Sequence, residues 1–185
     1  MQHPNILELS RSALLIIDMQ EAFRASIKNF ERLAARIAIA TRGAQLLNLP
    51  IIVTEQYPKG LGHTAVEITE VLPVGASVLE KTSFSSCGAE QFYSKLQERE
   101  TKHVIVAGIE AHVCVNQTVH DLLAAGLHVH LLTDCITSRR KSDHKTAITK
   151  MQASGAILSS VEMALFELMR DARHEQFKAV QGLIK

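Results

Sequence analysis

The sequence has few aromatic residues and no excess of either charge. Among 185 residues it has no Trp, two Tyr and six Phe, and its 20 basic and 19 acidic residues give a formal net charge of +1. Nucleic-acid binding uses basic stripes and aromatic platforms, and anionic membranes attract polybasic segments. Because the sequence lacks both features, we expect neither nucleic acid nor a membrane as a partner.

Long apolar runs and an even set of cysteines are also missing. No run approaches the length of about 20 apolar residues that a membrane span needs. The first six residues have neither the charged nor the apolar region of a secretory signal. Three cysteines argue against a disulfide framework and fit a reducing compartment. We therefore expect a soluble, intracellular, cytoplasmic protein.

The sequence does contain enough apolar material for one domain spanning residues 1–185. Hydrophobic residues make up 46% of the chain, and no low-complexity or linker-like segment divides it. Short runs rich in Val, Ile and Leu recur with little polar alternation, which is typical of strands buried on both faces of a parallel sheet. These runs are residues 13–18, 50–54, 77–80, 103–107, 128–132 and 156–159.

The segments between these runs favour helices. Apolar residues from Phe30 to Leu47 recur at spacings of three and four and form one stripe. Helices are predicted over residues 30–47, 88–100, 114–125, 142–154, 161–169 and 174–184. Consecutive parallel strands need right-handed crossovers. The prediction is therefore an α/β, three-layer Rossmann-like fold with a six-stranded parallel sheet flanked by helices.

Three chemically complementary residues fall at the ends of predicted strands. Asp18 ends the first run, Lys81 follows the third, and Cys114 follows the fourth across a glycine turn, at the start of a helix. Ligands of open α/β sheets bind beyond the carboxyl ends of the strands. A nucleophile, a base and a cation are therefore predicted to meet at one edge of the sheet.

These residues permit hydrolysis through a covalent thioester. The helix dipole and Lys81 would favour the thiolate of Cys114, and Asp18 would accept the thiol proton. Backbone N–H groups of the 109–114 turn would bind the oxyanion, and water would then hydrolyse the thioester with Asp18 as base. Purely structural roles remain as alternatives: a buried apolar role for Cys114, a helix cap for Asp18 and a surface position for Lys81.

Other histidines and cysteines have less specific patterns. His112 lies two residues before Cys114, and a turn or substrate-contact role is favoured over direct catalysis. Cys87 is expected at the rim of the site and Cys135 in the core. Packing or surface roles are expected for three histidines without metal-site spacing, His120, His128 and His130.

Three segments resemble the signature segments of the isochorismatase-like cysteine hydrolases. They are Leu15-Ile-Ile-Asp-Met-Gln-Glu-Ala-Phe23, Glu80-Lys-Thr-Ser-Phe84 and Gly108-Ile-Glu-Ala-His-Val-Cys-Val115. Residues 54–64 and 177–185 are similar to the branch of isochorismatase domain-containing proteins. The resemblance implies a triad of Asp18, Lys81 and Cys114 and the strand order 3-2-1-4-5-6.

The resemblance also implies details of the site and the assembly. A cis peptide between Ile109 and Glu110 would aim the N–H of Glu110, with that of Cys114, at the oxyanion. From their positions after strands, Phe23 and Tyr57 are expected either in the substrate pocket or as simple core contacts, and Gln56, Ile109 and His112 complete the predicted pocket. Relatives are oligomeric, so a homo-oligomer is expected, with the loop over residues 57–62 as a lid or subunit contact. Similarity to a trypanosomatid relative described as a mitochondrial-associated ribonuclease leaves a mitochondrial association open.

One departure from the superfamily concerns metal binding. Nicotinamidases hold a divalent metal with an Asp-x-His pair after the second strand, where this chain has Gln56, Tyr57 and Pro58. Gln56 is neutral and Pro58 has no donor atom, so these residues do not suit a metal. We expect no metal and no other cofactor.

Three functional hypotheses follow. The first is a cofactor-independent cysteine hydrolase that cleaves a C–N bond of a small amide, ureido or imide compound through a thioester at Cys114. The second is a non-catalytic oligomeric binding or assembly protein with a relic triad. The third is a thiol redox sensor that uses Cys114 and Cys87. The intact Asp18, Lys81 and Cys114 favour the enzyme.

Overall fold

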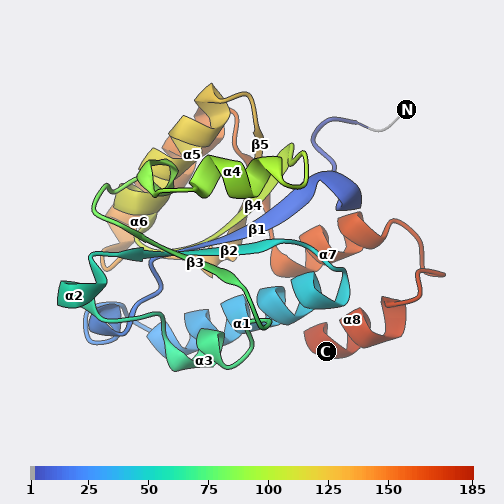
Figure 1. The fold of residues 1–185 in the computed structure, drawn as a ribbon, viewed down its shortest axis with the longest axis horizontal. Coiled ribbons are helices and arrows are strands. Elements are labelled where there is room, and N and C mark those ends of the chain that lie inside the picture. The colour runs from blue at the N-terminus through green and yellow to red at the C-terminus, as the bar shows by residue number, and fades with distance from the viewer. Residues whose placement is uncertain (1–2) are drawn as a thin grey trace.

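Six parallel strands form one sheet in the computed structural model, which describes residues 3–185 (Figure 1). The strands are β1 (Ser12–Ile17), β2 (Ile51–Gln56), β3 (Ser77–Lys81), β4 (His103–Gly108), β5 (His128–Ile136) and β6 (Ile157–Ser159). Their order is β3-β2-β1-β4-β5-β6, and the pairs are parallel. The predicted α/β fold and strand order are confirmed, and the order reverses between β1 and β4.

Helices cover both faces of the sheet (Figure 1). One face is covered by α1 (Phe30–Leu46), α3 (Val66–Thr69), α7 (Val161–Met169) and α8 (Phe177–Ile184). The other is covered by α4 (Phe92–Gln97), α5 (Asn116–Ala124) and α6 (Lys141–Ala153). The short α2 (Pro58–Leu61) follows β2. No helix within residues 3–185 has the length and apolar character needed to cross a membrane.

The position of β1 inside the sheet explains its unbroken apolar sequence. Leu14 and Ile16 pack into the core beneath α1 and α7, whereas Leu15 and Ile17 pack into the core beneath α5 and α6. Both faces of β1 are therefore buried, as the apolar run predicts.

Three predicted elements differ from the structure. Burial alternates along β3 because it is an edge strand, so the predicted burial of both its faces is wrong. The helix predicted over 88–100 is reduced to α4, because Gln91 before it has a left-handed backbone. The helix predicted from Cys114 begins at Asn116, because Ala111–Val115 forms a π-helical turn.

Three histidines meet at the amino-terminal edge of the sheet. His103 Nδ1 lies 3.2 Å from His130 Nε2, and the His103 ring stacks on His128 with centroids 5.0 Å apart. Nδ1 of the fully buried His130 has no hydrogen-bond partner in the described part of the chain. Burial, and then His103 and His128, lowers the pKa of His130 to about 3. His130 is therefore neutral in the folded protein near neutral pH.

Acid is expected to destabilise the fold through His130. Its pKa in the folded chain lies below the unfolded value of about 6.5, so its contribution to stability is complete above pH 6.5 and is lost as pH falls. The free energy of unfolding should fall by about 1.4 kcal/mol per pH unit below 6 from this residue alone. Urea unfolding between pH 6.5 and 4.5 should show a shallower pH slope for His130→Leu. If His130→Leu kept the wild-type pH slope, or if a variant of the exposed His3 became equally shallow, the assignment of the acid effect to His130 would be wrong.

Candidate active site

Asp18 follows β1 and is almost fully buried, with 1% of its surface exposed. Its backbone is left-handed (φ 49°), and its N–H donates to the Thr54 carbonyl at 3.0 Å. Oδ1 accepts from Thr54 Oγ1 at 2.8 Å, and Oδ2 accepts from Lys81 Nζ at 2.6 Å. Both carboxylate oxygens are therefore fixed by neighbouring strands.

Lys81 is the last residue of β3, and its side chain is buried completely. Besides Asp18 Oδ2, its ammonium donates to Gln56 Oε1 at 2.9 Å and to the carbonyls of Ser83 and Phe84 at 3.2 and 3.0 Å. One carboxylate and three neutral oxygens thus surround Nζ. The alternative prediction that Lys81 is a surface lysine is wrong.

Cys114 completes this group from the π-helical turn after β4. Its thiol interacts with the Asp18 carboxylate, and 8% of the residue is exposed. Burial, and then the charge of Asp18, raises the pKa of Cys114 to about 12, which Lys81 only partly opposes. Burial also raises the pKa of Asp18 against the opposing effect of Lys81. Burial and the Asp18 charge thus favour the protonated thiol in the resting site, whereas the sequence predicts a thiolate.

Three residues with hydroxyl side chains link the Asp18 carboxylate to the Cys114 backbone through hydrogen bonds. Thr54 Oγ1 donates to Asp18 and lies 3.1 Å from Ser86 Oγ, so Ser86 must be the donor between the two hydroxyls. The Ser86 N–H donates to Thr118 Oγ1 at 2.8 Å, and Thr118 Oγ1 donates to the Cys114 carbonyl at 2.7 Å. Sequence reasoning missed these residues. The spacing of four between Cys114 and Thr118 was the available signal.

Thr118→Val is expected to lower the free energy of unfolding by about 1–3 kcal/mol. The substitution keeps the shape of the fully buried side chain but leaves the Ser86 N–H without its acceptor. Thr149→Val is the matched control, because its exposed hydroxyl also donates four residues back, to the Lys145 carbonyl. Chemical denaturation should show a loss in the first variant and a change below about 0.5 kcal/mol in the second.

Two glutamines hold the ends of β2 and β3 together. The fully buried Gln20 accepts from the Gln56 N–H at 2.8 Å and donates to the carbonyls of Gln56 and Gly62. Gln56 accepts from Lys81 and donates to the Thr82 carbonyl at 2.7 Å. The Gln56 side-chain oxygen is therefore engaged by Lys81. Residues 3–185 contain no group of three His, Cys, Asp or Glu side chains arranged to hold a metal ion.

The turn after β4 places backbone donors beside Cys114. Gly108 has φ +123°, and a Cβ there would lie 2.1 Å from the Ile17 carbonyl oxygen, so only glycine fits. The peptide between Ile109 and Glu110 is cis, where the resemblance placed it. Within residues 3–185 the Glu110 N–H donates to no other group, whereas the Ala111 N–H donates to the Thr137 carbonyl at 2.8 Å. The Glu110 N–H is thus free for a ligand.

The sequence and the fold match those of a known family. The sequence profile of the Isochorismatase domain matches residues 12–163. The chain belongs to the isochorismatase family. Isochorismatase domain-containing protein 2 of Danio rerio is 39% identical over 96% of this chain and 89% of its own length. The solved structure of MAR1 ribonuclease from Caenorhabditis elegans has a TM-score of 0.91 and 40% identity, covering 97% of this chain and 92% of that one.

A more distant structure extends the likeness in fold alone. The YcaC gene product of Escherichia coli, described as an octameric hydrolase of unknown specificity, is 22% identical with a TM-score of 0.90. The alignment covers 100% of this chain and 91% of that one. This isochorismatase-family chain therefore has the hydrolase fold of its family.

The other predicted pocket residues of this isochorismatase-family chain are spread around the three central side chains. Tyr57 is 55% exposed and borders an open hollow of about 400 Å³, together with Lys81. Phe23 packs against the core beneath α1, and Ile109 is fully buried in that core. His112 Nδ1 lies 3.0 Å from Ser138 Oγ, which fits the turn role rather than catalysis.

Burial disfavours the thiolate form of the two other cysteines of the family member. Burial raises the pKa of Cys87, whose side chain hydrogen-bonds Tyr93. Cys135 is fully buried in β5, as predicted, and burial raises its pKa well above the ordinary range. Among the three thiols, only that of Cys114 interacts with both a carboxylate and a lysine ammonium.

Proposed function

We propose that this isochorismatase-family protein is a cofactor-independent cysteine hydrolase that cleaves the C–N bond of a small amide, ureido or imide compound. One observation carries the proposal: in a nearly buried site, the Asp18 carboxylate accepts from the Lys81 ammonium at 2.6 Å and interacts with the Cys114 thiol. Buried charges and nucleophiles arranged in this way are typical of covalent catalysis.

In the first half-reaction, Cys114 Sγ attacks the carbonyl carbon as its proton moves to Asp18. The oxyanion accepts hydrogen bonds from the N–H groups of Glu110 and Cys114. Asp18 then returns the proton to the substrate nitrogen, the C–N bond breaks, and the amine or ammonia leaves. The remaining acyl group is a thioester on Cys114.

In the second half-reaction, Asp18 takes a proton from water as the water oxygen attacks the thioester carbon. Collapse releases a carboxylic or carbamic acid, and the proton returns to sulfur. The charge of the site stays constant at each attack, because the negative charge moves from Asp18 to the oxyanion beside the same Lys81 ammonium. Lys81 therefore stabilises the charge at both ends of its path.

The partners of the proposed enzyme are a small-molecule substrate and further copies of the chain. An open hollow of about 400 Å³ borders the end of β3 and is large enough for a small molecule, although neither Asp18 nor Cys114 lines it. Tyr57 and Phe84 are 55% and 53% exposed near this site, and large exposed apolar side chains favour a subunit contact. The octameric assembly stated for the E. coli protein supports a homo-oligomer here.

The redox-sensor hypothesis is less well supported. A sensor needs an accessible thiol with a low pKa. The pKa values of Cys114 and Cys87 are instead raised, mainly by burial. Proton transfer to Asp18 during attack requires no low pKa in the resting thiol, so the hydrolase is the better match.

Trapping of the thioester tests the proposed function. The protein is incubated with primary amides, N-carbamoyl compounds and cyclic imides, quenched with acid and analysed by intact-protein mass spectrometry, with ammonia or amine release measured in parallel. We expect an acyl adduct on Cys114 with at least one class, retained in Cys87→Ala and lost in Cys114→Ala. Absence of adduct and of product release with every class would favour the non-catalytic binding protein with a relic triad.

A further inference from the structure

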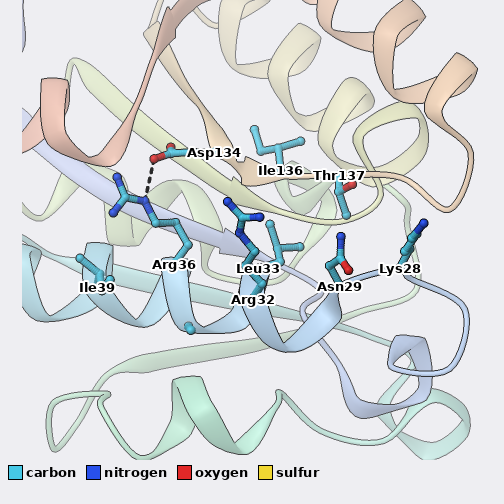
Figure 2. A pocket seen from close by; sticks show the side chains of 10 residues that line it. Lys28, Asn29, Arg32, Leu33, Arg36, Ile39, Asp134, Ile136 and Thr137 are labelled. Atoms are coloured by element: carbon cyan, nitrogen blue, oxygen red, sulfur yellow. Dashed lines mark hydrogen bonds and ion pairs between the residues drawn. The ribbon is translucent and has the colours of Figure 1, made fainter. Parts of the chain in front are cut away.

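A basic hollow lies between the start of α1 and the end of β5, on the α1-covered side of the sheet (Figure 2). We call it the α1–β5 hollow; its volume is about 500 Å³. Lys28, Arg32 and Arg36 line it from the α1 side, and Asp134 and Thr137 line it from the β5 side. Neither Asp18, Lys81 nor Cys114 contributes to its walls.

The positive charges of the hollow are only partly balanced. Asp134 is its one acidic lining residue, and it already accepts from Arg36 Nε at 2.7 Å and from the Val161 N–H at 3.1 Å. Within residues 3–185, the side chains of Lys28 and Arg32 make no hydrogen bond or ion pair, and Arg36 uses only Nε. The hollow therefore presents two uncompensated cations and several unused N–H donors.

The start of α1 adds to this positive field. The helix has 17 residues, and its N-cap residue, Asn29, makes no side-chain capping bond to the first turn. The free N–H groups of a helix start favour anions, with the positive end of the helix dipole. Lys28 and Arg32 thus add side-chain cations at this helix start, where the one acidic residue of the first turn, Glu31, pairs with Arg24 at 3.3 Å.

We propose that the α1–β5 hollow binds a small phosphate-type oxyanion, either free phosphate or the phosphate group of a small phosphomonoester. The planar guanidinium of Arg32 pairs two oxygens of a tetrahedral anion, and Lys28 provides a second point charge. The partly exposed Ile39 also lines the hollow and provides apolar surface for an organic group attached to the phosphate.

The segment on the β5 side of the hollow forms hydrogen bonds with the turn that carries Cys114. The Thr137 carbonyl, on its β5 side, accepts the Ala111 N–H at 2.8 Å. Two residues further on, the Arg139 N–H donates to Glu110 Oε1 at 2.9 Å. An anion at the hollow therefore lies against the segment that holds both proposed oxyanion donors in place.

Calorimetric titration with inorganic phosphate and with phenyl phosphate, at constant ionic strength set by chloride, tests the proposal without any turnover. We expect saturable binding that Lys28→Gln combined with Arg32→Gln weakens at least tenfold. Arg42→Gln is the matched control, because Arg42 lies exposed on the same helix outside the hollow. Its affinity should stay within twofold of wild type.

The two probes distinguish the sources of the phosphate group. Tighter binding of phenyl phosphate would identify a phosphomonoester, whereas equal affinities would identify the free anion. Absence of saturable binding with both probes, or the same affinity in the double variant as in wild type, would overturn the proposal. Circular dichroism of the variants, whose substituted side chains are exposed, would verify that each remains folded.

Discussion

Asp18→Asn is expected to make Cys114 easier to alkylate while abolishing its use in hydrolysis. The charge of Asp18 and its hydrogen bond to the thiol both raise the pKa of Cys114, whereas Lys81 lowers it. Removal of the carboxylate should therefore lower the thiol pKa from about 12. Because the thiolate is less nucleophilic as its pKa falls, alkylation at pH 8 should accelerate about threefold for each unit of the decrease.

Turnover should change in the opposite direction. The asparagine amide of this variant can neither accept the thiol proton nor return one to the leaving nitrogen, so kcat should fall by about 10²–10⁴-fold. Iodoacetamide kinetics across pH and hydrolysis of the substrate found by trapping measure the two effects separately. Asp171→Asn, on an exposed carboxylate, controls for the loss of charge. Slower alkylation together with unchanged turnover would refute the assigned role of Asp18.

The fold could be predicted because its strands carry a strong local signal. β1, β2 and β4 lie inside the sheet, so nearly all of their residues are buried and each strand contains a recognisable apolar run. β3 is less regular because its burial depends on a place at the edge that no local pattern records. α4 is short because of the left-handed backbone at Gln91, a residue that has no glycine-like signature.

The central site residues could be predicted for a different reason. The carboxyl ends of parallel strands share one edge, so Asp18, Lys81 and Cys114 had to converge once their strands were known. Their supporting hydroxyls could not be found in this way. Thr54 and Ser86 are 32 residues apart and resemble ordinary core residues until the fold brings them to 3.1 Å.

The protonation of the site was also beyond sequence reasoning. A position near a helix start suggests a lowered thiol pKa. The structure instead buries Cys114 beside a carboxylate, and both effects outweigh the Lys81 ammonium. These effects depend on depth and distance, which become known only when Cys114 and Asp18 are placed in three dimensions.

Lys81→Met is expected to lower the free energy of unfolding at pH 7 by about 3–5 kcal/mol. Met preserves the length of the side chain, but it leaves the Asp18 carboxylate buried without its counter-ion. Combining Lys81→Met with Asp18→Asn also removes the buried charge. The double variant should regain part of the lost free energy of unfolding, because a neutral pair avoids the desolvation penalty. Urea denaturation of the four proteins in this cycle gives the coupling energy.

The pH dependence of the loss identifies its cause. Lys81 lowers the pKa of Asp18, so its removal raises further a pKa that burial already holds above the ordinary value of 3.8. A carboxyl whose pKa is raised in the folded chain destabilises it as pH rises above the unfolded pKa. The deficit of Lys81→Met should therefore be small near pH 4, where Asp18 is protonated, and grow toward pH 7.

Lys95→Met, which removes an exposed ion pair with Glu98, is the control and should lower the free energy of unfolding by less than about 1 kcal/mol. A deficit in Lys81→Met that is the same at pH 4 and pH 7 would place the lost stability in packing instead of in the buried charge of Asp18.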